Sequence, residues 1–230
     1  MRTSGKRPPA AINFMKPYYE HAGITIYHGD CREILPELEK VDLVLTDPPY
    51  GIKMSQGFGG FGGFGEPIAR KQYPDIWDND RPDPILFNFL IDGSANQIIW
   101  GGNFFADILP RSTHWIFWNK LQTMPTFGDG ELAWTNFERK SVRMVTVEWN
   151  GLLGKEPEGR KHPTQKPLKL LLWCVTEYSE LHKTILDPFM GSGTTLRAAK
   201  DLGRKAIGIE IEEKYCEIAA KRLSQEVFNF

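Results

Sequence analysis

The chain has 230 residues, of which 41% are hydrophobic and 25% are charged. This balance is typical of a globular protein and excludes a wholly disordered or fibrous chain. The length suits one large domain, or one domain with an insertion. Lys and Arg (28) nearly balance Asp and Glu (29), so the net charge is -1. A surface of this balance does not bind polyanions indiscriminately.

Binding to nucleic acid would therefore need a local basic patch. Three stretches are candidates, namely Arg2 to Arg7, Arg139 to Arg143 and Lys155 to Lys169. Each of them can also be read as a set of solvated loop charges. These charges alone do not decide between the two readings.

The sequence has no run of eighteen apolar residues and no signal-peptide pattern, so we expect a cytoplasmic protein that does not enter a membrane. The three cysteines, Cys31, Cys174 and Cys216, lie far apart and form no CxxC pair. A disulfide framework or a cysteine zinc site is therefore not expected. We predict reduced thiols that are mostly buried.

Short apolar runs alternate with helix-like segments, which predicts a doubly wound α/β fold with a largely parallel sheet. The predicted strands are 24–28, 41–46, 97–100, 115–118, 142–149, 184–186 and 205–209. The predicted helices are 31–40, 84–96, 167–179, 192–202 and 212–223. These elements form a single domain over residues 1–230.

Two stretches interrupt the alternation. The segment 51–81 contains GFGGFGGFG from Gly57 to Gly65, and this density of glycine predicts a mobile loop. The segment 120–161 mixes Gly, Pro and charged residues around one strand candidate. We interpret it as a short insertion that projects from the sheet.

The first segment with recognisable chemistry is Thr46-Asp47-Pro48-Pro49-Tyr50, directly after the apolar run VDLVL. In open α/β sheets, ligands bind beyond the carboxyl ends of the strands. The segment there offers a carboxylate, a carbonyl oxygen and an aromatic face, held by two prolines that lack N–H donors. This set suits a planar ring with an exocyclic amine. The alternative is a plain turn that ends a strand.

The second segment is Ile185-Leu186-Asp187-Pro188-Phe189-Met190-Gly191-Ser192-Gly193-Thr194-Thr195. A strand, a glycine turn and a helix N-terminus place backbone N–H groups where a ligand can approach closely. Glu210 lies nineteen residues beyond Gly191, at the end of the next predicted strand. An acid there can accept both hydroxyl protons of a ribose. The pattern indicates an adenosine-containing cofactor and does not match GxGxxG.

Three motifs now appear together, in the order TDPPY, HPTQKP (His162–Pro167) and DPFMGSGTT. In this order they resemble motifs IV, X and I of the amino-directed DNA methyltransferases, in the circularly permuted beta group. The match extends from about Ile24 to Leu223. The resemblance implies a seven-stranded methyltransferase fold, S-adenosylmethionine as cofactor, and methylation of a flipped base in DNA.

By this resemblance, Asp47 and the Pro48 carbonyl hold the target amine, Pro49 sets the turn and Tyr50 stacks on the base. The cofactor residues that it implies are Asp30, Asp47, Thr164, Gln165, Lys166, Asp187, Phe189, Gly191, Ser192, Gly193, Thr194 and Glu210. Two of these have plain structural alternatives. Asp30 can be a helix N-cap, and Lys166 can be an ordinary surface lysine.

The predicted reaction is site-specific transfer of a methyl group to N6 of adenine in double-stranded DNA. The nearest alternative is cytosine N4, although enzymes of that specificity mostly have Ser where Asp47 stands. A non-catalytic DNA- or cofactor-binding protein is a further alternative. RNA and protein-glutamine methyltransferases usually place such a tetrapeptide after the cofactor loop, so the motif order opposes them. The short target-recognition segment also allows readout shared across a homodimer.

Overall fold

The computed structural model describes residues 16–52, 80–122, 128–149 and 165–225. The glycine-rich stretch from Gly57 to Gly65, which the sequence predicts to be mobile, lies outside these ranges. So do Thr164 and part of the predicted insertion at 120–161.

The described residues form one nine-stranded sheet with the order β1-β2-β9-β8-β3-β4-β6-β5-β7. Its strands are β1 (Tyr19–His21), β2 (Ile24–His28), β3 (Val41–Thr46), β4 (Ser94–Trp100), β5 (Trp115–Asn119), β6 (Gly130–Thr135), β7 (Val142–Thr146), β8 (Thr184–Asp187) and β9 (Lys205–Glu210). Strand β1 pairs antiparallel with β2, and β6 pairs antiparallel with β4 and β5. The remaining pairings are parallel.

All seven predicted strands are present. The described residues also form β1 and β6, so the prediction of seven strands is two too few. Strand β1 has three residues, which is too short for a periodic pattern. Strand β6 has the sequence GELAWT, whose glycine and glutamate depress its strand propensity. The expectation that 120–161 projects from the sheet is therefore wrong for Gly130–Thr135 and Val142–Thr146, which belong to the sheet.

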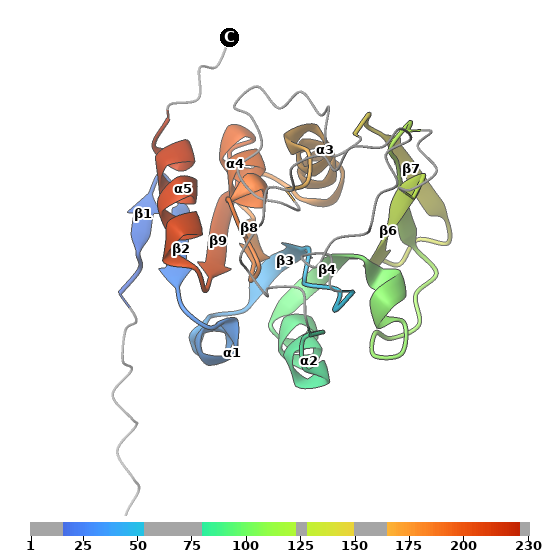
Figure 1. Ribbon diagram of the computed structural model, residues 1–230, viewed down its shortest axis with the longest axis horizontal. Helices are drawn as coiled ribbons and strands as arrows, with labels where there is room; N and C mark the ends of the chain where they lie inside the picture. The colour runs from blue at the N-terminus through green and yellow to red at the C-terminus, as the bar shows by residue number, and fades with distance from the viewer. Residues whose placement is uncertain (1–15, 53–79, 123–127, 150–164, 226–230) are drawn as a thin grey trace, which may run out of the picture.

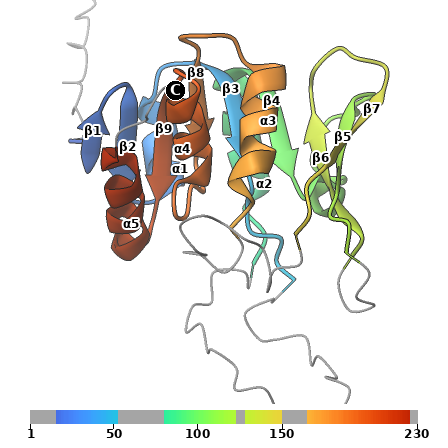
Figure 2. The same ribbon diagram turned by 90° about the horizontal axis from the view of Figure 1, so that it is seen from above.

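Helices cover both faces of the sheet, as the doubly wound class requires (Figures 1 and 2). They are α1 (Cys31–Ile34), α2 (Pro84–Asp92), α3 (Leu168–Tyr178), α4 (Thr194–Asp201) and α5 (Glu213–Ser224). Helices α3, α4 and α5 lie on one face, and α1 and α2 lie on the other. Within the described ranges, no helix has the length and apolar character needed to cross a bilayer.

Two predicted helices are shorter than expected. The first ends as a 3-10 turn, Leu35–Glu37, because Pro36 cannot donate the hydrogen bond that would continue an α-helix. The second ends at Asp92, where the Gly93 N–H donates to the carbonyl of Phe89. The residues predicted to complete it, from Ser94 to Asn96, begin β4 instead.

The core follows from the alternation of side chains along the central strands. In β3, Leu43 and Leu45 pack beneath α3 and α4, whereas Val44 packs on the opposite face with Ile34 and Leu86. All three β3 side chains are almost completely buried. Full burial of such a side chain contributes about 1.5–3 kcal/mol. The apolar run therefore fixes β3 at the centre and places the residue that follows it at the sheet edge.

Candidate active site

Acidic side chains gather along one edge of the sheet. The parallel strands β2, β9, β8 and β3 end there, so the edge carries in spatial order Asp30, Glu210, Asp187 and Asp47. Strand β6 runs in the opposite direction, so its start brings Glu131 to the same edge. Five acids from segments far apart in the chain thus come together where ligands of such sheets bind.

Asp47 and Tyr50 are in direct contact just beyond β3. The Tyr50 hydroxyl donates a hydrogen bond of 2.5 Å to Asp47 Oδ1. The Tyr50 ring stacks on Phe104, with centroids 4.7 Å apart and planes 17° apart. Behind the ring lies Gly101, where an added Cβ would be 2.1 Å from Tyr50 Cε1. The predicted tetrapeptide is therefore held in one geometry by packing around its tyrosine.

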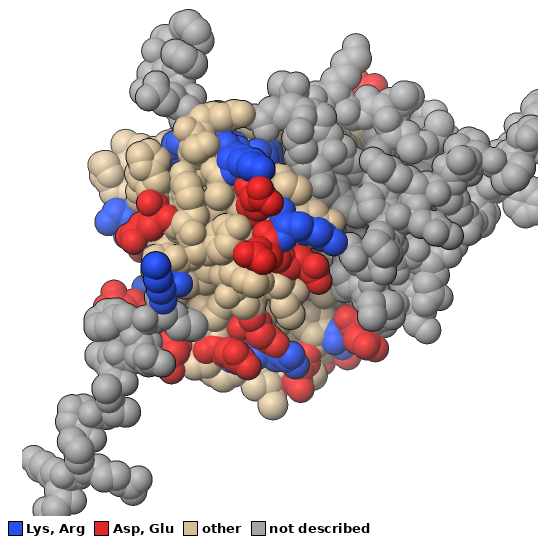
Figure 3. All heavy atoms as spheres, turned by 60° about the vertical axis from the view of Figure 1, so that its left-hand side comes forward, with Lys and Arg blue, Asp and Glu red and all other residues tan. Residues whose placement is uncertain are grey.

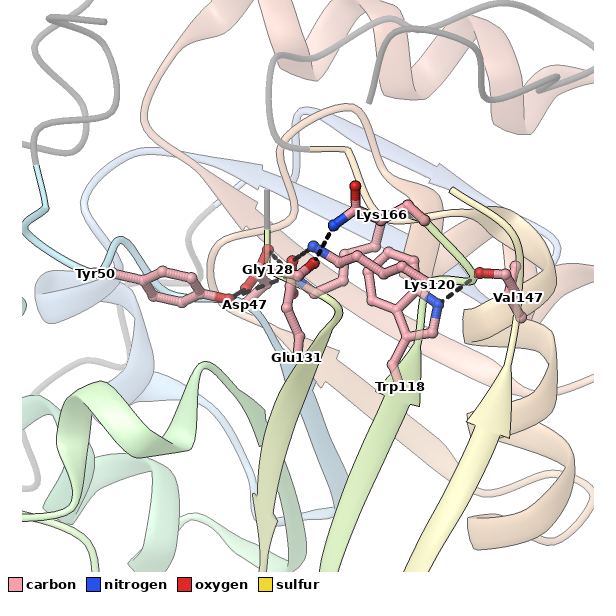
Figure 4. A network of polar contacts seen from close by, with 9 residues as sticks. Asp47, Tyr50, Trp118, Lys120, Gly128, Glu131, Val147 and Lys166 are labelled. Carbon is pink, nitrogen blue, oxygen red and sulfur yellow. Dashed lines mark hydrogen bonds and ion pairs between the residues drawn. The ribbon is translucent and has the colours of Figure 1, made fainter. Parts of the chain in front are cut away.

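A buried lysine joins this pair. Lys166 Nζ lies 2.6 Å from Asp47 Oδ2 and 3.0 Å from Glu131 Oε2, and it donates to the Tyr50 hydroxyl at 3.3 Å. Figure 4 shows the ammonium between the two carboxylates. Only 8% of the Lys166 side chain is exposed. The alternative reading of Lys166 as an ordinary surface lysine is wrong.

Glu131 is held by a second lysine. Lys120, just after β5, lies 2.5 Å from Glu131 Oε1 and 4.9 Å from the ring centre of Trp118. Strand pairing sets this approach, because Trp118 lies opposite Glu131. Burial opposes ionisation of Glu131, but Lys166 and Lys120 outweigh it and hold its pKa at about 2. The two lysines therefore favour the ionised form of Glu131.

Burial and neighbouring charges also have opposing effects on the pKa values of Lys166 and Asp47. Burial lowers the stability of the ammonium, but Asp47 and Glu131 outweigh that effect and raise the pKa of Lys166. Burial, together with the nearby charge of Glu131, raises the pKa of Asp47. The Lys166 ammonium opposes this rise and favours the ionised form of Asp47. In its ionised form Asp47 has two oxygens that can accept hydrogen bonds.

The glycine loop precedes α4. Gly191 and Gly193 have φ angles of 49° and 75°, a region that strains other residues. A Cβ on Gly193 would lie 2.8 Å from Ala219 Cβ of α5. Ser192 and Thr194 are buried, and the Arg222 guanidinium donates to Ser192 O at 2.7 Å and to Thr194 Oγ1 at 3.3 Å. The loop thus packs against Ala219 and is hydrogen-bonded to Arg222, both of which belong to α5.

Glu210 and Asp187 are tied to the same loop. Glu210 accepts from the N–H groups of Gly191 and Glu212, at 3.0 and 2.9 Å. Asp187 accepts from the Phe189 N–H at 3.2 Å and from the Thr46 hydroxyl at 2.8 Å. Burial raises the pKa of Glu210 and raises that of Asp187 to about 6.

This loop fits an adenosine-containing cofactor. Glycines with positive φ permit close approach of a ligand to the backbone, and α4 begins directly after them. Glu210 is fixed by backbone donors at the end of β9, with a carboxylate that can accept ribose hydroxyls. The donor set is the one that the sequence pattern predicts.

The remaining predicted residues divide into two groups. Gln165 reaches the loop, because Ser192 Oγ donates to Gln165 Oε1 at 3.1 Å; with Lys166 it links the loop to Asp47. Asp30 caps α1 by accepting from the Arg32 N–H at 2.9 Å and also pairs with the Arg32 guanidinium. The N-cap reading of Asp30 is therefore confirmed, and its contact with a cofactor adenine stays a prediction.

Sequence reasoning missed Glu131, Lys120, Thr46 and Arg222 as contributors to the site. Glu131 could be found only by recognising β6 as a strand that runs against its neighbours. Thr46 carries a visible signal, because it ends an apolar strand next to Asp47. The contact of Arg222 with the loop depends on the packing of α5 beside α4, which no local pattern reveals.

The basic stretch from Arg139 to Arg143 is partly engaged within the fold. Arg143 pairs with Glu177 at 3.1 Å, and Arg139 lies 5.2 Å from the ring centre of Tyr178. The other two basic stretches lie wholly or largely outside the described ranges. On the face shown in Figure 3, acidic and basic side chains are mixed. The described surface in that view carries no field of a single sign.

Comparisons with known proteins agree with this geometry. The family model for DNA methylases matches residues 68–221. Type II methyltransferase M.HinfI of Haemophilus influenzae is 30% identical over 87% of this chain and 68% of its own length. M2.LlaDCHI of Lactococcus lactis subsp. cremoris is 29% identical over 91% of this chain and 93% of its own length.

A solved structure of M1.HpyAVI in complex with SAM is also similar, with a TM-score of 0.59 and 27% identity. The match covers 88% of this chain and all of that one. The family-model match includes the glycine loop and Glu210 of the site described above. The chain therefore belongs to the N6/N4 DNA methylase family, and its cofactor is S-adenosylmethionine.

Proposed function

We propose that this protein transfers the methyl group of S-adenosylmethionine to N6 of a flipped adenine in double-stranded DNA, at a specific site. The observation that carries the proposal is the position of Asp47. Its carboxylate lies at the edge of the sheet, beside Tyr50 and between the cofactor loop and β4. A carboxylate only accepts hydrogen bonds from an amine, whereas the serine found at this position in most cytosine-N4 enzymes can also donate.

The chemistry required of the protein follows from the amine. The exocyclic nitrogen of adenine is a weak nucleophile, because its lone pair is delocalised into the ring. Asp47 and the Pro48 carbonyl would accept its two N–H groups, favour a pyramidal nitrogen and stabilise the positive charge that develops there. The cofactor supplies a methyl group already activated on a sulfonium. Direct transfer then needs no covalent intermediate with the protein.

Base flipping fits the same residues. Extrusion of a base from a duplex costs a few kcal/mol, and stacking on Tyr50 would offset part of that cost. The ring is pre-positioned for this role by Phe104 on one side and by Gly101 behind it. The site thus offers a planar support and two acceptors to one flipped base.

The cysteines oppose methylation at carbon. Cytosine C5 methylation requires a thiolate nucleophile, but Cys31, Cys174 and Cys216 are buried and unpaired with one another. Burial raises the pKa of Cys31 and of Cys216 to about 12 and raises that of Cys174 as well. Thiols of such high pKa are protonated at neutral pH.

The product identifies the reaction. We would incubate unmethylated DNA with the protein and S-adenosylmethionine, digest the DNA to nucleosides and separate these by mass spectrometry. N6-methyladenine is the expected product, with duplex DNA modified faster than a single strand of the same sequence. Asp47→Ala protein is the matched control.

Other products would change the conclusion in defined ways. N4-methylcytosine as the sole product would overturn the base assignment and leave the acceptor mechanism in place. The absence of a methylated nucleoside from either DNA or RNA would favour a binding protein. Sedimentation with and without DNA tests whether the protein acts as a homodimer.

A further inference from the structure

In this structure the Lys166 ammonium is paired with Asp47, the carboxylate that we propose accepts the target amine. The Lys166 ammonium forms ion pairs with Asp47 and Glu131 and donates a hydrogen bond to the Tyr50 hydroxyl. Asp47 Oδ1 already accepts from the Tyr50 hydroxyl, and Oδ2 faces the lysine. An incoming amine would thus meet a carboxylate that is engaged on both oxygens.

An ammonium beside Asp47 is also unfavourable for methyl transfer. Methyl transfer builds positive charge on the target nitrogen, and a cation beside Asp47 both repels that charge and cancels the carboxylate that stabilises it. In a site shielded from water such interactions are several-fold stronger than at a surface. A productive complex therefore needs a second acceptor for Lys166.

Glu131 is placed to be that acceptor. It already lies 3.0 Å from Lys166 Nζ, slightly farther than Asp47 at 2.6 Å, so a small movement of the ammonium changes its principal partner. Lys120 and the pairing of β5 with β6 fix the position of the Glu131 carboxylate. The carboxylate can thus receive Lys166 without moving (Figure 4).

We propose that Glu131 is a positioning residue for methyl transfer, which takes over the Lys166 ammonium when the amino group of the target base binds Asp47. This role rests on the proposed function, because it assumes that Asp47 receives the amine. Glu131 itself touches neither base nor cofactor in this role. It acts through Lys166.

The test removes the charge of Glu131 and keeps its shape. In Glu131→Gln, Lys166 has Asp47 as its main carboxylate partner, so the single-turnover rate of DNA methylation should fall about ten- to a hundredfold. The dissociation constant for S-adenosylmethionine should change less than about twofold, because the glycine loop and Glu210 are untouched. Glu177→Gln is the matched control; Glu177 pairs with Arg143 away from the site, and this variant should keep the wild-type rate.

A double variant distinguishes positioning from structural support. In Glu131→Gln with Lys166→Gln, no ammonium remains to occupy Asp47, so at saturating cofactor the rate should exceed that of Glu131→Gln alone. Thermal unfolding confirms that each variant is folded. A double variant no faster than Glu131→Gln, or a single variant as fast as the wild type, would overturn the role of Glu131.

The experiments distinguish failure of the proposed role of Glu131 from failure of the proposed function. A wild-type protein that methylates adenine, with Glu131→Gln equally fast, removes the role of Glu131 and leaves the reaction. A wild-type protein that yields no methylated nucleoside removes the proposed function and the role of Glu131 with it.

Discussion

At the scale of single residues, Asp47 and Glu210 have different surroundings in the site. Asp47 contacts Tyr50 and Lys166, whereas Glu210 contacts the backbone of the cofactor loop. The two carboxylates lie beyond different strands, β3 and β9, which are separated in the sheet by β8. Their contributions to rate and to cofactor affinity should therefore be separable by mutation.

We predict that Asp47→Ala lowers the rate of methyl transfer at least about a hundredfold and leaves cofactor affinity nearly unchanged. Glu210→Ala should do the reverse and weaken S-adenosylmethionine binding about 10- to 100-fold, since hydrogen bonds to a charged group contribute about 1.5–3 kcal/mol. Calorimetry gives the affinities, and single-turnover assays give the rates. An equal loss of binding in Asp47→Ala would show that this residue belongs to the cofactor site.

Asp187 predicts a pH dependence of stability. Its pKa is raised by burial from 3.8 to about 6, so the folded protein binds this proton more tightly than the unfolded chain. The resulting stabilisation is present below about pH 4, is lost as pH rises through 6, and amounts to roughly 3 kcal/mol. Urea unfolding at pH 4 to 7 should show Asp187→Asn gaining stability relative to the wild type as pH rises.

Asp42 offers a control of opposite sign. The Thr184 N–H and Lys183 lower its pKa, so its stabilisation is present at neutral pH and is lost as pH falls. Asp42→Asn should therefore lose stability relative to the wild type as pH rises from 3 to 5. If both variants followed the same trend, the titrating group in the first experiment would not be Asp187.

At the scale of elements, the turn after β4 sets the position of the Tyr50 ring. Gly101 has a φ of 68°, and its missing side chain leaves the space that the Tyr50 ring fills. The turn leads into the 3-10 segment Gly102–Phe105, whose Phe104 stacks on the same ring. One strand end thus provides both the space for Tyr50 and the surface against which it packs.

We predict that Gly101→Ala lowers the methylation rate about tenfold or more, because its Cβ would displace Tyr50, while S-adenosylmethionine affinity stays unchanged. Gly203→Ala is the matched control: its φ is 70°, but its Cβ would meet only Leu181 Cδ2 at 3.8 Å. Both substitutions carry a backbone cost of about 1–2 kcal/mol, measurable by urea unfolding. Equal rates in the two variants would mean that the ring position does not govern catalysis.

At the scale of the whole molecule, the strands before the glycine loop and before Asp47 belong to one sheet. Thr46 and Asp187 join the ends of β3 and β8 by a hydrogen bond, and Gln165 and Lys166 connect the loop to Asp47. Strands from both halves of the chain share one continuous core. Ligand binding at the edge should thus stabilise the entire unit.

We predict a single unfolding transition that shifts upward as a whole with S-adenosylmethionine. At a concentration of 100 times the dissociation constant, binding contributes about 2.7 kcal/mol, or roughly 5–10 °C in Tm for a chain of this size. Differential scanning calorimetry measures the shift, and Glu210→Ala should shift less at the same concentration. Two transitions, of which only one moves, would show that the sheet does not unfold as a unit.

The sequence by itself determined the local elements and the chemistry that they carry. The apolar run before Asp47 predicts a buried strand, and the glycines before Thr194 predict a turn into a helix, because side-chain period and backbone freedom are local properties. The predicted strand boundaries alone place Asp47, Asp187 and Glu210 at or just beyond the ends of three strands. The order of the motifs indicated the family.

Only the tertiary structure decided how these parts meet. That Lys166 is buried between Asp47 and Glu131 depends on which strands are neighbours and on the reversed direction of β6. The hydrogen bond from Arg222 to the loop likewise depends on the packing of α5 beside α4. Asp47 and Lys166, for example, are 119 positions apart in the chain. Such contacts arise from burial and strand order, which a local pattern does not encode.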